Sequence, residues 1–515
     1  MTIRIGRTIK ITTPSPRIRW AFFFAAALFA LAVRLPRLGE RPMHTDESVN
    51  AYITGELLAG KSFHYDPQDR HGPALFVLAE PVARLLGANN FSGLTESQLR
   101  LSPVLAGTAT VLLFGAGVEM FGFIPCLVAA LLFAFAPLPL YYSRYFIHET
   151  LFVAVTLGLI LSGWQALRKS SLPSAALAGF CAALMLACKE TAALHFFAVA
   201  VALFVCRFAA SRHFGMPGPV PARTFGILTC AWTAPGAPGW KIILAATTAF
   251  LFTFILLFTW FGRDWQALPD LVRAIPNFAA RAGGEGHQKP FWYYLKLLAG
   301  GGSGGIIFAL AVLGFFRARG SASRLFLAIY ALLIITIYSA IPYKTPWLAL
   351  NFWLPLALLA GLAIEWIWFA TTKLPVRAAV LVSLAAVGSL IAQDTRQRVF
   401  LHPADENNPY AYAHTVEDLL RLPPRLAQLA RQENLAQPRI AVVAADPWPL
   451  PWYLRKYSQV GFWQPGQNPG AADFFITSPE AAEKLGDKLK NFRPEYFGVR
   501  PEVLIILWSP WDRSR

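Results

Sequence analysis

Charged residues are scarce in this chain. Of its 515 residues only 15% are Asp, Glu, Lys or Arg, against about a quarter in soluble globular proteins. Hydrophobic residues make up 55%, and the mean hydropathy is +0.45. This shortage of charge excludes a soluble enzyme, and the apolar content excludes a disordered protein. The composition is typical of a polytopic membrane protein with some polar mass outside the bilayer.

Cysteine is scarce too, which excludes a disulfide-rich secreted domain. We expect the cysteines to be small buried hydrophobic residues, because they lie in or beside apolar stretches without metal-ligand spacing. No small-residue cleavage pattern follows the apolar run 20–33 near the N-terminus. We therefore predict a retained first membrane helix there, not a signal peptide.

Long apolar runs, by contrast, are plentiful. A spanning helix needs about 20 apolar residues, and the runs predict about eleven spans. The amphipathic segment 72–87 contains Glu80 and Arg84, so we expect a helix lying in the membrane interface. The predicted spans are 18–36, 100–121, 123–142, 148–167, 173–190, 192–210, 241–262, 302–317, 324–342, 346–369 and 375–393.

Acidic residues are missing from every second loop between these spans. Those loops are rich in Lys and Arg, and Glu119 and Glu365 are the only acids near them. Because basic residues collect in cytoplasmic loops, we predict a multi-pass protein of the cell inner (plasma) membrane. Its N-terminus is expected in the cytoplasm and its C-terminus outside. The net charge of +17 thus reports orientation, and we expect no nucleic-acid partner.

The polar stretches predict the domain organisation. We expect a transmembrane domain over 1–395, with outer loops at 37–99 and 263–300, and an extracytoplasmic α/β domain over 396–515. The linker 214–240, rich in Pro and Gly, is expected in the cytoplasm. In the α/β domain we predict helices near 415–433, from 446 onward and at 479–491, and strands at 439–445, 473–477, 495–499 and 502–508.

Ionisable residues crowd the outer ends of the predicted spans, where polar groups at membrane depth are functional candidates. Simpler explanations exist for each cluster. Thr45 could cap a helix whose first turn contains Asp46 and Glu47, lone lysines can snorkel to headgroups, and histidines often form structural hydrogen bonds. The combination nevertheless fits transfer from a lipid-phosphate donor, in which a carboxylate accepts the proton of the attacking hydroxyl and cations stabilise the departing phosphate.

Seven motifs make this interpretation specific. They resemble the GT-C glycosyltransferases, in the branch of the dolichyl-phosphate-mannose protein mannosyltransferases and the bacterial aminoarabinose transferases. More closely, they resemble the group described as predicted membrane-bound mannosyltransferases, or flippase-activity-associated proteins. The extra β-trefoil domain of the protein mannosyltransferases is not seen in this sequence. The motifs are HTDESVNAY, HYDPQDRHGPALF, SRYFIHET, KETA, IPYKTPWL, NPYAYAHT and DPWPLPWYLRKY, between residues 44 and 457.

The resemblance implies an inverting glycosyltransferase that moves a sugar, with mannose as the candidate from the mannosyltransferase families, from a polyprenyl-phosphate donor to an extracytoplasmic glycan, lipid or protein acceptor. The acidic motif falls on Asp46, as general base, and on Glu47, as an orienting group. The cations assigned to the donor phosphate are Arg144, Lys189 and Lys344. Further substrate-binding candidates are His64, Arg70, His71, Glu149, Glu190, Glu285, His287 and Tyr343.

Two alternatives stay open. One is a transporter or flippase component for lipid-linked sugars, although ionisable groups crowding one face and the lack of an internal repeat disfavour it. The other is an inactive homologue whose outer domain binds a partner. No cofactor is expected to be required. Two adjacent acids beside several cations suit a monophosphate-sugar donor, and enzymes that use such donors generally need no metal. A requirement for a divalent metal is the weaker prediction.

Overall fold

The computed structural model describes residues 2–5, 7–10, 14–68, 71–211, 238–284 and 286–511. Within these residues, seven helices are long and apolar enough to cross a membrane. An eighth span results if α15 (Tyr293–Ala299) and α16 (Gly302–Arg317), which meet at 107°, are counted as one. The long helices are α1 (Pro16–Arg34), α4 (Glu96–Ala116), α8 (Glu149–Lys169), α13 (Gly239–Phe258), α17 (Ala322–Ala340), α18 (Leu350–Ala370) and α19 (Leu374–Thr395).

The prediction of a polytopic helical membrane protein is confirmed, with seven or eight candidate spans instead of eleven. Three predicted positions hold shorter apolar helices: α6 (Phe123–Phe135), α9 (Leu172–Cys188) and α10 (Ala192–Ser211). The expected span 123–142 is shorter because Pro137 begins a separate helix, α7 (Pro137–Tyr142). The expected linker 214–240 lies almost wholly outside the described residues.

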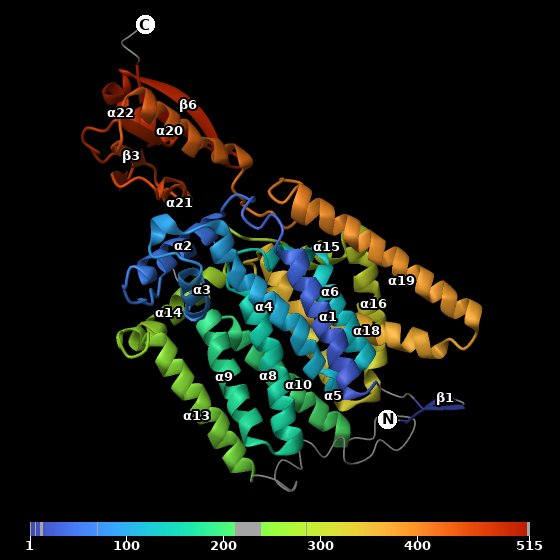
Figure 1. Cartoon of the computed structure of the whole chain (residues 1–515). Helices are drawn as coiled ribbons and strands as arrows, with labels where there is room; N and C mark the ends of the chain where they lie inside the picture. The colour runs from blue at the N-terminus through green and yellow to red at the C-terminus, as the bar shows by residue number, and fades with distance from the viewer. Residues whose placement is uncertain are drawn as a thin grey trace.

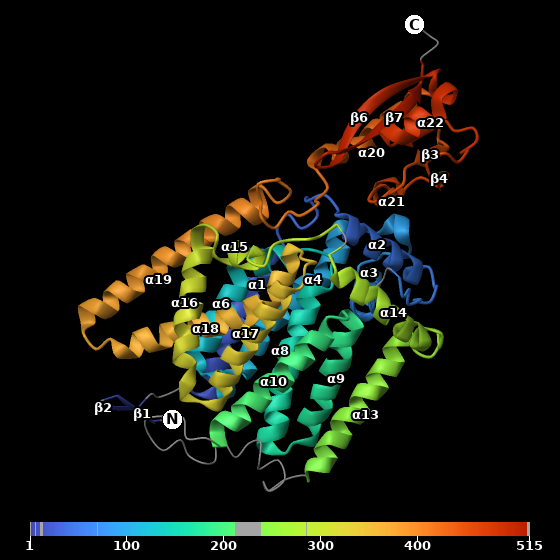
Figure 2. The same cartoon turned by 180° about the vertical axis from the view of Figure 1, so that it is seen from behind.

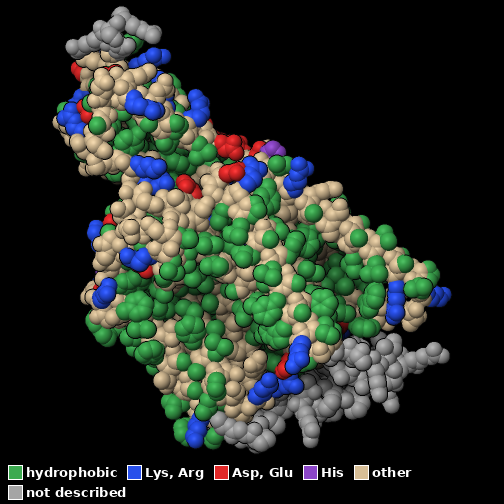
Figure 3. All heavy atoms as spheres, viewed as in Figure 1, with side chains coloured by type: hydrophobic (Ala, Val, Ile, Leu, Met, Phe, Trp, Pro, Cys, Tyr) green, Lys and Arg blue, Asp and Glu red, His purple; other side chains and the backbone are tan. Residues whose placement is uncertain are grey.

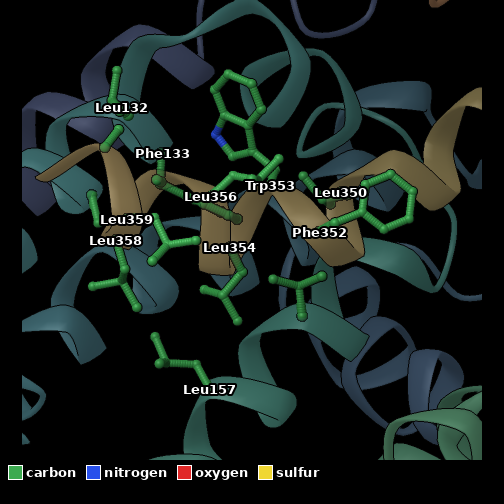
Figure 4. Close-up of a cluster of buried hydrophobic side chains, with 14 of the residues drawn as sticks. Leu132, Phe133, Leu157, Leu350, Phe352, Trp353, Leu354, Leu356, Leu358 and Leu359 are labelled. Atoms are coloured by element: carbon green, nitrogen blue, oxygen red, sulfur yellow. The ribbon is translucent and has the colours of Figure 1, made fainter. Parts of the chain in front are cut away.

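The core of the membrane domain surrounds α18. This helix is apolar on all sides, as expected of a fully buried helix, and 94% of its span is buried. Its side chains Leu354, Leu356 and Leu358 pack among residues of α6 and α8 (Figure 4). By contrast, α19 leans away from the bundle (Figures 1 and 2), and only 6% of its span is buried. The exposed apolar surface of α19 is available to lipid.

The two ends of the bundle differ in charge as the loops predict. At the end near the N-terminus, Arg168 and Lys169 lie 3.8 and 3.4 Å from Glu119, and Arg324 lies 2.6 Å from Glu365. Blue side chains mark this end in Figure 3. The only acids near the predicted inner loops are therefore paired with basic residues of those loops.

The opposite end is covered by short helices that lie across it (Figure 2). We call this end the outer end, after the predicted orientation, and the first predicted outer stretch contains α2 (Thr45–Leu58), α3 (Ala74–Leu85) and η1 (Phe91–Gly93). The second contains α14 (Ala267–Ala282) and α15, neither of which the sequence analysis predicts. Helix α3 is the expected amphipathic helix; it packs against α2 and α4.

The C-terminal region folds as a mixed α/β domain with a five-stranded sheet in the order β4-β3-β5-β7-β6. All four predicted strands are confirmed; β4 is missed, because the sequence analysis continues a helix toward it. Strand β3 pairs in parallel with β4 and β5, whereas β7 pairs antiparallel with β5 and β6. The strands are β3 (Ile440–Val443), β4 (Val460–Trp463), β5 (Phe474–Thr477), β6 (Phe492–Arg500) and β7 (Val503–Pro510).

Both faces of this sheet are covered by helix. Leu426 and Leu429 of α20 (Leu422–Gln432) pack on one face. Leu485 of α22 (Pro479–Leu485) packs on the other, together with the turn η6 (Gly486–Leu489). This explains why β3 and β5 are buried at every position instead of alternating between buried and exposed residues.

The C-terminal domain rests on the first outer stretch of the membrane domain. Helix α21 (Leu450–Leu454) lies over α2 (Figure 1). The Tyr453 hydroxyl accepts the N–H of Met43 at 2.9 Å, and Thr415 donates to the Met43 carbonyl at 2.7 Å. The Trp452 indole donates to Glu96 at 2.8 Å. Residues just before α2 are thus held from above by the C-terminal domain.

We predict that Gly314→Ala destabilises the bundle. A Cβ at this position of α16 would lie 1.8 Å from the Leu359 carbonyl oxygen of α18, so the two helices must separate. Overpacking of this kind costs about 1–3 kcal/mol, seen as a lower melting temperature of the purified protein. Gly163→Ala is the matched control, because a Cβ there meets nothing within 4 Å. Equal melting temperatures for the two variants would contradict the close α16–α18 contact.

Candidate active site

The acidic motif lies at the start of α2 with Asp46 and Glu47 in its first turn, and the N-cap is His44 instead of the alternative Thr45. The His44 Nδ1 accepts the N–H of Asp46 at 3.0 Å, and the His44 N–H donates to Glu47 at 3.2 Å. Burial lowers the pKa of His44 although Asp46 and Glu47 oppose the shift. The ring is therefore neutral, and its Nε2–H donates to the Tyr412 carbonyl at 3.1 Å.

Glu47 is completely buried, and protein donors surround its carboxylate. Arg100 of α4 donates from Nε and Nη2 at 2.8 Å each, and the Phe146 N–H donates at 2.9 Å. Arg41 adds a contact at 3.4 Å. Burial alone would raise the pKa of Glu47, but Arg100, Arg41 and these hydrogen bonds lower it to about 2. These contacts hold the fold, and a role for Glu47 toward substrate stays a prediction.

The neighbouring acid, Asp46, is accessible to solvent. Its side chain is 48% exposed, and the neutral His44 ring lies 3.9 Å away. Its charge acts on two groups of other segments. It raises the pKa of His287, against the larger lowering by burial, and it adds to the raised pKa of Tyr343, for which burial is the main cause. The charge of Asp46 therefore reaches His287, in the second predicted outer loop, and Tyr343, in the turn after α17.

These two turns pair with each other beside the acid. The His287 ring lies 4.8 Å from that of Tyr343, and its Nδ1 is 2.7 Å from the Tyr412 hydroxyl. The Lys344 N–H donates to the His287 carbonyl at 3.0 Å. Residues separated by more than a hundred positions in the chain thus form one wall next to Asp46.

Rings from five motif positions pack together next to that wall. We call His44, Tyr145, Trp347, Tyr412 and His414 the aromatic cluster. The two histidines stack at 5.6 Å, and Trp347 lies 6.0 Å from Tyr412. The sequence analysis names none of these five as a site residue, although four motifs contain them. Their signal is the repeated occurrence of Tyr, Trp and His within polar motifs.

Lys189 forms an ion pair with Glu149 at the outer ends of α9 and α8. Burial lowers the pKa of Lys189, but the ion pair with Glu149 raises it by more, so that the net pKa lies above the ordinary lysine value and the ammonium stays charged. That charge lowers the pKa of Tyr343, on which Asp46 also acts. Of the three predicted cations, Lys189 is the one whose charge acts on the same tyrosine as that of Asp46.

A second acid–base pair lies beside this one. His71 Nδ1 is 3.0 Å from Glu190, and the His71 ring is 5.2 Å from that of His148. The buried Nε2 of His148 has no hydrogen-bond partner in the described part of the chain. Lys189, Glu149, Glu190 and His71 thus form one polar group near Tyr343.

The other two predicted cations contact backbone. Arg144 donates to the carbonyls of Arg34, Pro36 and Arg37, and its guanidinium lies 4.8 Å over the Phe400 ring. Lys344 is buried and donates to the carbonyls of Lys289 and Ile341. Both side chains fix loops of the outer end, and a contact with donor phosphate stays a prediction for each.

Of the remaining predicted site residues, one is described and two are not. His64 is exposed and pairs with Asp264 at 2.7 Å. Arg70 and Glu285 lie outside the described residues. Over the ranges that the structure describes, no group of three His, Cys, Asp or Glu could hold a metal ion.

Comparison with known proteins identifies the fold. Residues 70–234 match the family described as dolichyl-phosphate-mannose-protein mannosyltransferase. The structure is similar to ArnT from Cupriavidus metallidurans bound to undecaprenyl phosphate, with a TM-score of 0.63 and 15% identity over 95% of this chain and 97% of that one. The apo state of ArnT gives a TM-score of 0.61 and 17% identity, over 96% of this chain and 98% of that one.

A third similar structure is the archaeal oligosaccharyltransferase AglB from Archaeoglobus fulgidus, in complex with an inhibitory peptide and a dolichol-phosphate. Its TM-score is 0.56 at 14% identity, over 96% of this chain and 76% of that one. No curated protein matches the chain. These findings confirm the prediction of a membrane glycosyltransferase of the GT-C type with an ArnT-like fold.

We predict that amide substitution at the two adjacent acids affects stability very differently. Glu47→Gln leaves the Arg100 guanidinium buried without its counter-charge, which costs about 3–5 kcal/mol. Asp46→Asn changes a half-exposed group and leaves the melting temperature within about a degree, since surface substitutions shift stability by at most ~0.5 kcal/mol. Melting of the purified variants measures both effects.

The pH dependence gives an independent check. Because the folded-state pKa of Glu47 lies below its ordinary value, its contribution to stability is complete above the ordinary carboxyl pKa and is lost as the pH falls toward 2. The Glu47→Gln deficit should therefore be constant between pH 6 and 8. A deficit that vanishes in this range would contradict an ionised, paired Glu47.

Proposed function

We propose that the chain transfers a sugar from a polyprenyl-phosphate donor to a hydroxyl acceptor by a single inverting displacement, with Asp46 as general base. The observation that carries this proposal is the division of the acidic pair. Glu47 is fully engaged with protein donors, whereas the Asp46 carboxylate is open beside His287 and Tyr343. A base needs an accessible carboxylate with room for the acceptor.

The reaction follows from these positions. Asp46 takes the proton of the acceptor hydroxyl as its oxygen attacks the anomeric carbon. The bond between that carbon and the phosphate oxygen breaks on the opposite face, and the polyprenyl phosphate leaves with the electron pair. A fixed cation in a buried setting stabilises the charge that develops on this oxygen. We assign this task to Lys189, whose charge acts on the same tyrosine as Asp46.

Lys189 is suited to the task because its ammonium is buried and already oriented by Glu149. A phosphate that approaches Tyr343 would share the lysine with this carboxylate. Neighbouring His71 and Glu190 belong to the same polar group and are proposed to position the donor. We propose that no divalent metal is needed, since a lysine can supply the positive charge at a monophosphate leaving group.

The sugar and the acceptor are proposed from chemistry and likeness. Sugar-binding walls combine ring faces with a few placed polar groups, and the aromatic cluster beside Asp46 offers both. We propose mannose as the sugar, following the description of the matched family. We further propose that the chain belongs to the group of predicted membrane-bound mannosyltransferases, on the strength of the seven motifs. The acceptor is a glycan, lipid or protein outside the cytoplasm.

The transporter alternative is less favoured. A transporter places its ionisable groups near the middle of the bilayer, whereas Asp46, Lys189 and their partners lie at the outer helix ends. His195, within α10, is held by the hydroxyls of Tyr330 and Tyr338 at 2.7 and 3.1 Å. That histidine therefore has a structural explanation.

The first functional prediction is that Asp46→Asn abolishes transfer. Loss of a general base costs about 10²–10⁴ in rate, measured as radiolabelled sugar moved from a polyprenyl-phosphate donor in membranes. Lys189→Gln should lower kcat strongly, because it removes the cation at the leaving group. His64→Gln is the control, since the exposed His64 pairs with Asp264 and not with Asp46 or Lys189. Full activity of Asp46→Asn would remove Asp46 from the role of base.

The second prediction concerns the orientation of the chain in the membrane. We propose that the N-terminus is cytoplasmic and the C-terminal domain extracytoplasmic. Ser92→Cys should react with a membrane-impermeant maleimide on intact cells, and Lys169→Cys only after the membrane is opened. Both positions are exposed in the structure. The parent chain sets the background, because its described cysteines are buried. The reverse labelling pattern would invert the topology.

A further inference from the structure

A cavity separate from the Asp46 site lies where α1 and α19 reach the outer end. Its volume is about 220 Å³. Neither Asp46 nor the residues facing it contribute to its wall. Four of its lining residues are arginines: Arg37, Arg41, Arg100 and Arg144. The wall is completed by the acids Glu40 and Glu417 and by apolar side chains that include Phe400, Leu401 and Leu420.

The buried charge around this cavity is unbalanced. Arg100 is neutralised by Glu47, and Arg37, at the rim, by Glu40. Arg144 is 7% exposed and donates to neutral carbonyls. In the described part of the chain no carboxylate lies within 4.0 Å of it. The completely buried Arg34 nearby likewise donates only to Ser143 and carbonyls. Burial, together with Arg41, Arg100 and Arg34, lowers the pKa of Arg144 to about 9.

Arg41 supplies the second observation. Its side chain is 7% exposed, and its Nε is a buried donor without a hydrogen-bond partner. The guanidinium lies over the rings of Tyr145, at 4.4 Å, and Tyr141, at 5.0 Å, which fix its plane. Buried donors are nearly always satisfied in folded proteins. An oriented guanidinium at a cavity wall that keeps one unsatisfied donor is suited to a ligand that accepts a hydrogen bond.

We propose that this cavity binds the phosphate group of a membrane lipid. The excess of buried positive charge favours an anion, and the unsatisfied Nε–H of Arg41 is a donor for one of its oxygens. A lipid is the source that fits best, because apolar side chains line half of the wall and the cavity lies above the exposed apolar sides of α1 and α19, at Phe29 and Leu390. The proposal rests on these charges and does not depend on the function proposed for Asp46.

The test measures binding of radiolabelled farnesyl phosphate to the purified full-length chain in the Lys189→Gln background, so that the Asp46 site does not contribute. Leu420→Glu places an anion at the half-exposed rim of the cavity without removing a hydrogen bond, and we expect at least tenfold weaker binding. Leu504→Glu, at a similarly exposed leucine of β7, is the matched control and should bind like the background. Arg37→Glu repeats the charge change should Leu420→Glu fail to fold.

Two results would overturn the proposal. One is farnesyl phosphate binding that is equal in the background and in folded Leu420→Glu or Arg37→Glu protein. The other is displacement of farnesyl phosphate by equimolar inorganic phosphate, which would make the site one for free anions. Failure of the function proposed for Asp46 leaves a different signature, since it would show in transfer assays of Asp46→Asn and leave this binding unchanged.

Discussion

The buried ion pair between Glu47 and Arg100 is the interaction on which the outer end of the molecule depends. One carboxylate joins the first turn of α2, the start of α4 and the turn before α8, which contributes the Phe146 N–H. Burying two charges is costly, and the arrangement is stable only because each oxygen receives more than one donor. The preceding residue in the chain, Asp46, is thereby held at a defined place with its own carboxylate free.

The same pair orders the segments around it. Arg41, which contacts Glu47, also donates to the Arg144 carbonyl at 2.9 Å, and Arg144 in turn holds the end of α1. Above, the C-terminal domain fixes Met43. Motifs far apart in the chain thus meet around a single acidic turn, which explains why the ring residues of NPYAYAHT and PYKTPW lie beside HTDES.

The sequence predicts the architecture better than it predicts the site. Apolar runs locate the helices, but proline and glycine divide some runs, as at Pro137, so fewer helices are long enough to span. Strand β4 is missed because it is four residues long, contains Gly461 and lacks the buried pattern of β3. The different fates of Asp46 and Glu47 are unreadable from sequence, because adjacent helical residues point about 100° apart and the partner of Glu47 lies fifty-three positions away. Likewise, only the structure shows that Arg144 and Lys344 donate their hydrogen bonds to backbone carbonyls.

The most direct test of the central claim, that Glu47 holds the fold while Asp46 and Lys189 act on substrate, is a structure of the Asp46→Asn variant with a bound polyprenyl-phosphate sugar. We expect the sugar between residue 46 and Tyr343, its phosphate within ion-pair distance of Lys189, and Glu47 still paired with Arg100. A phosphate in the Arg144 cavity with the sugar turned away from residue 46, or a Glu47 released from Arg100 to contact the sugar, would contradict the account.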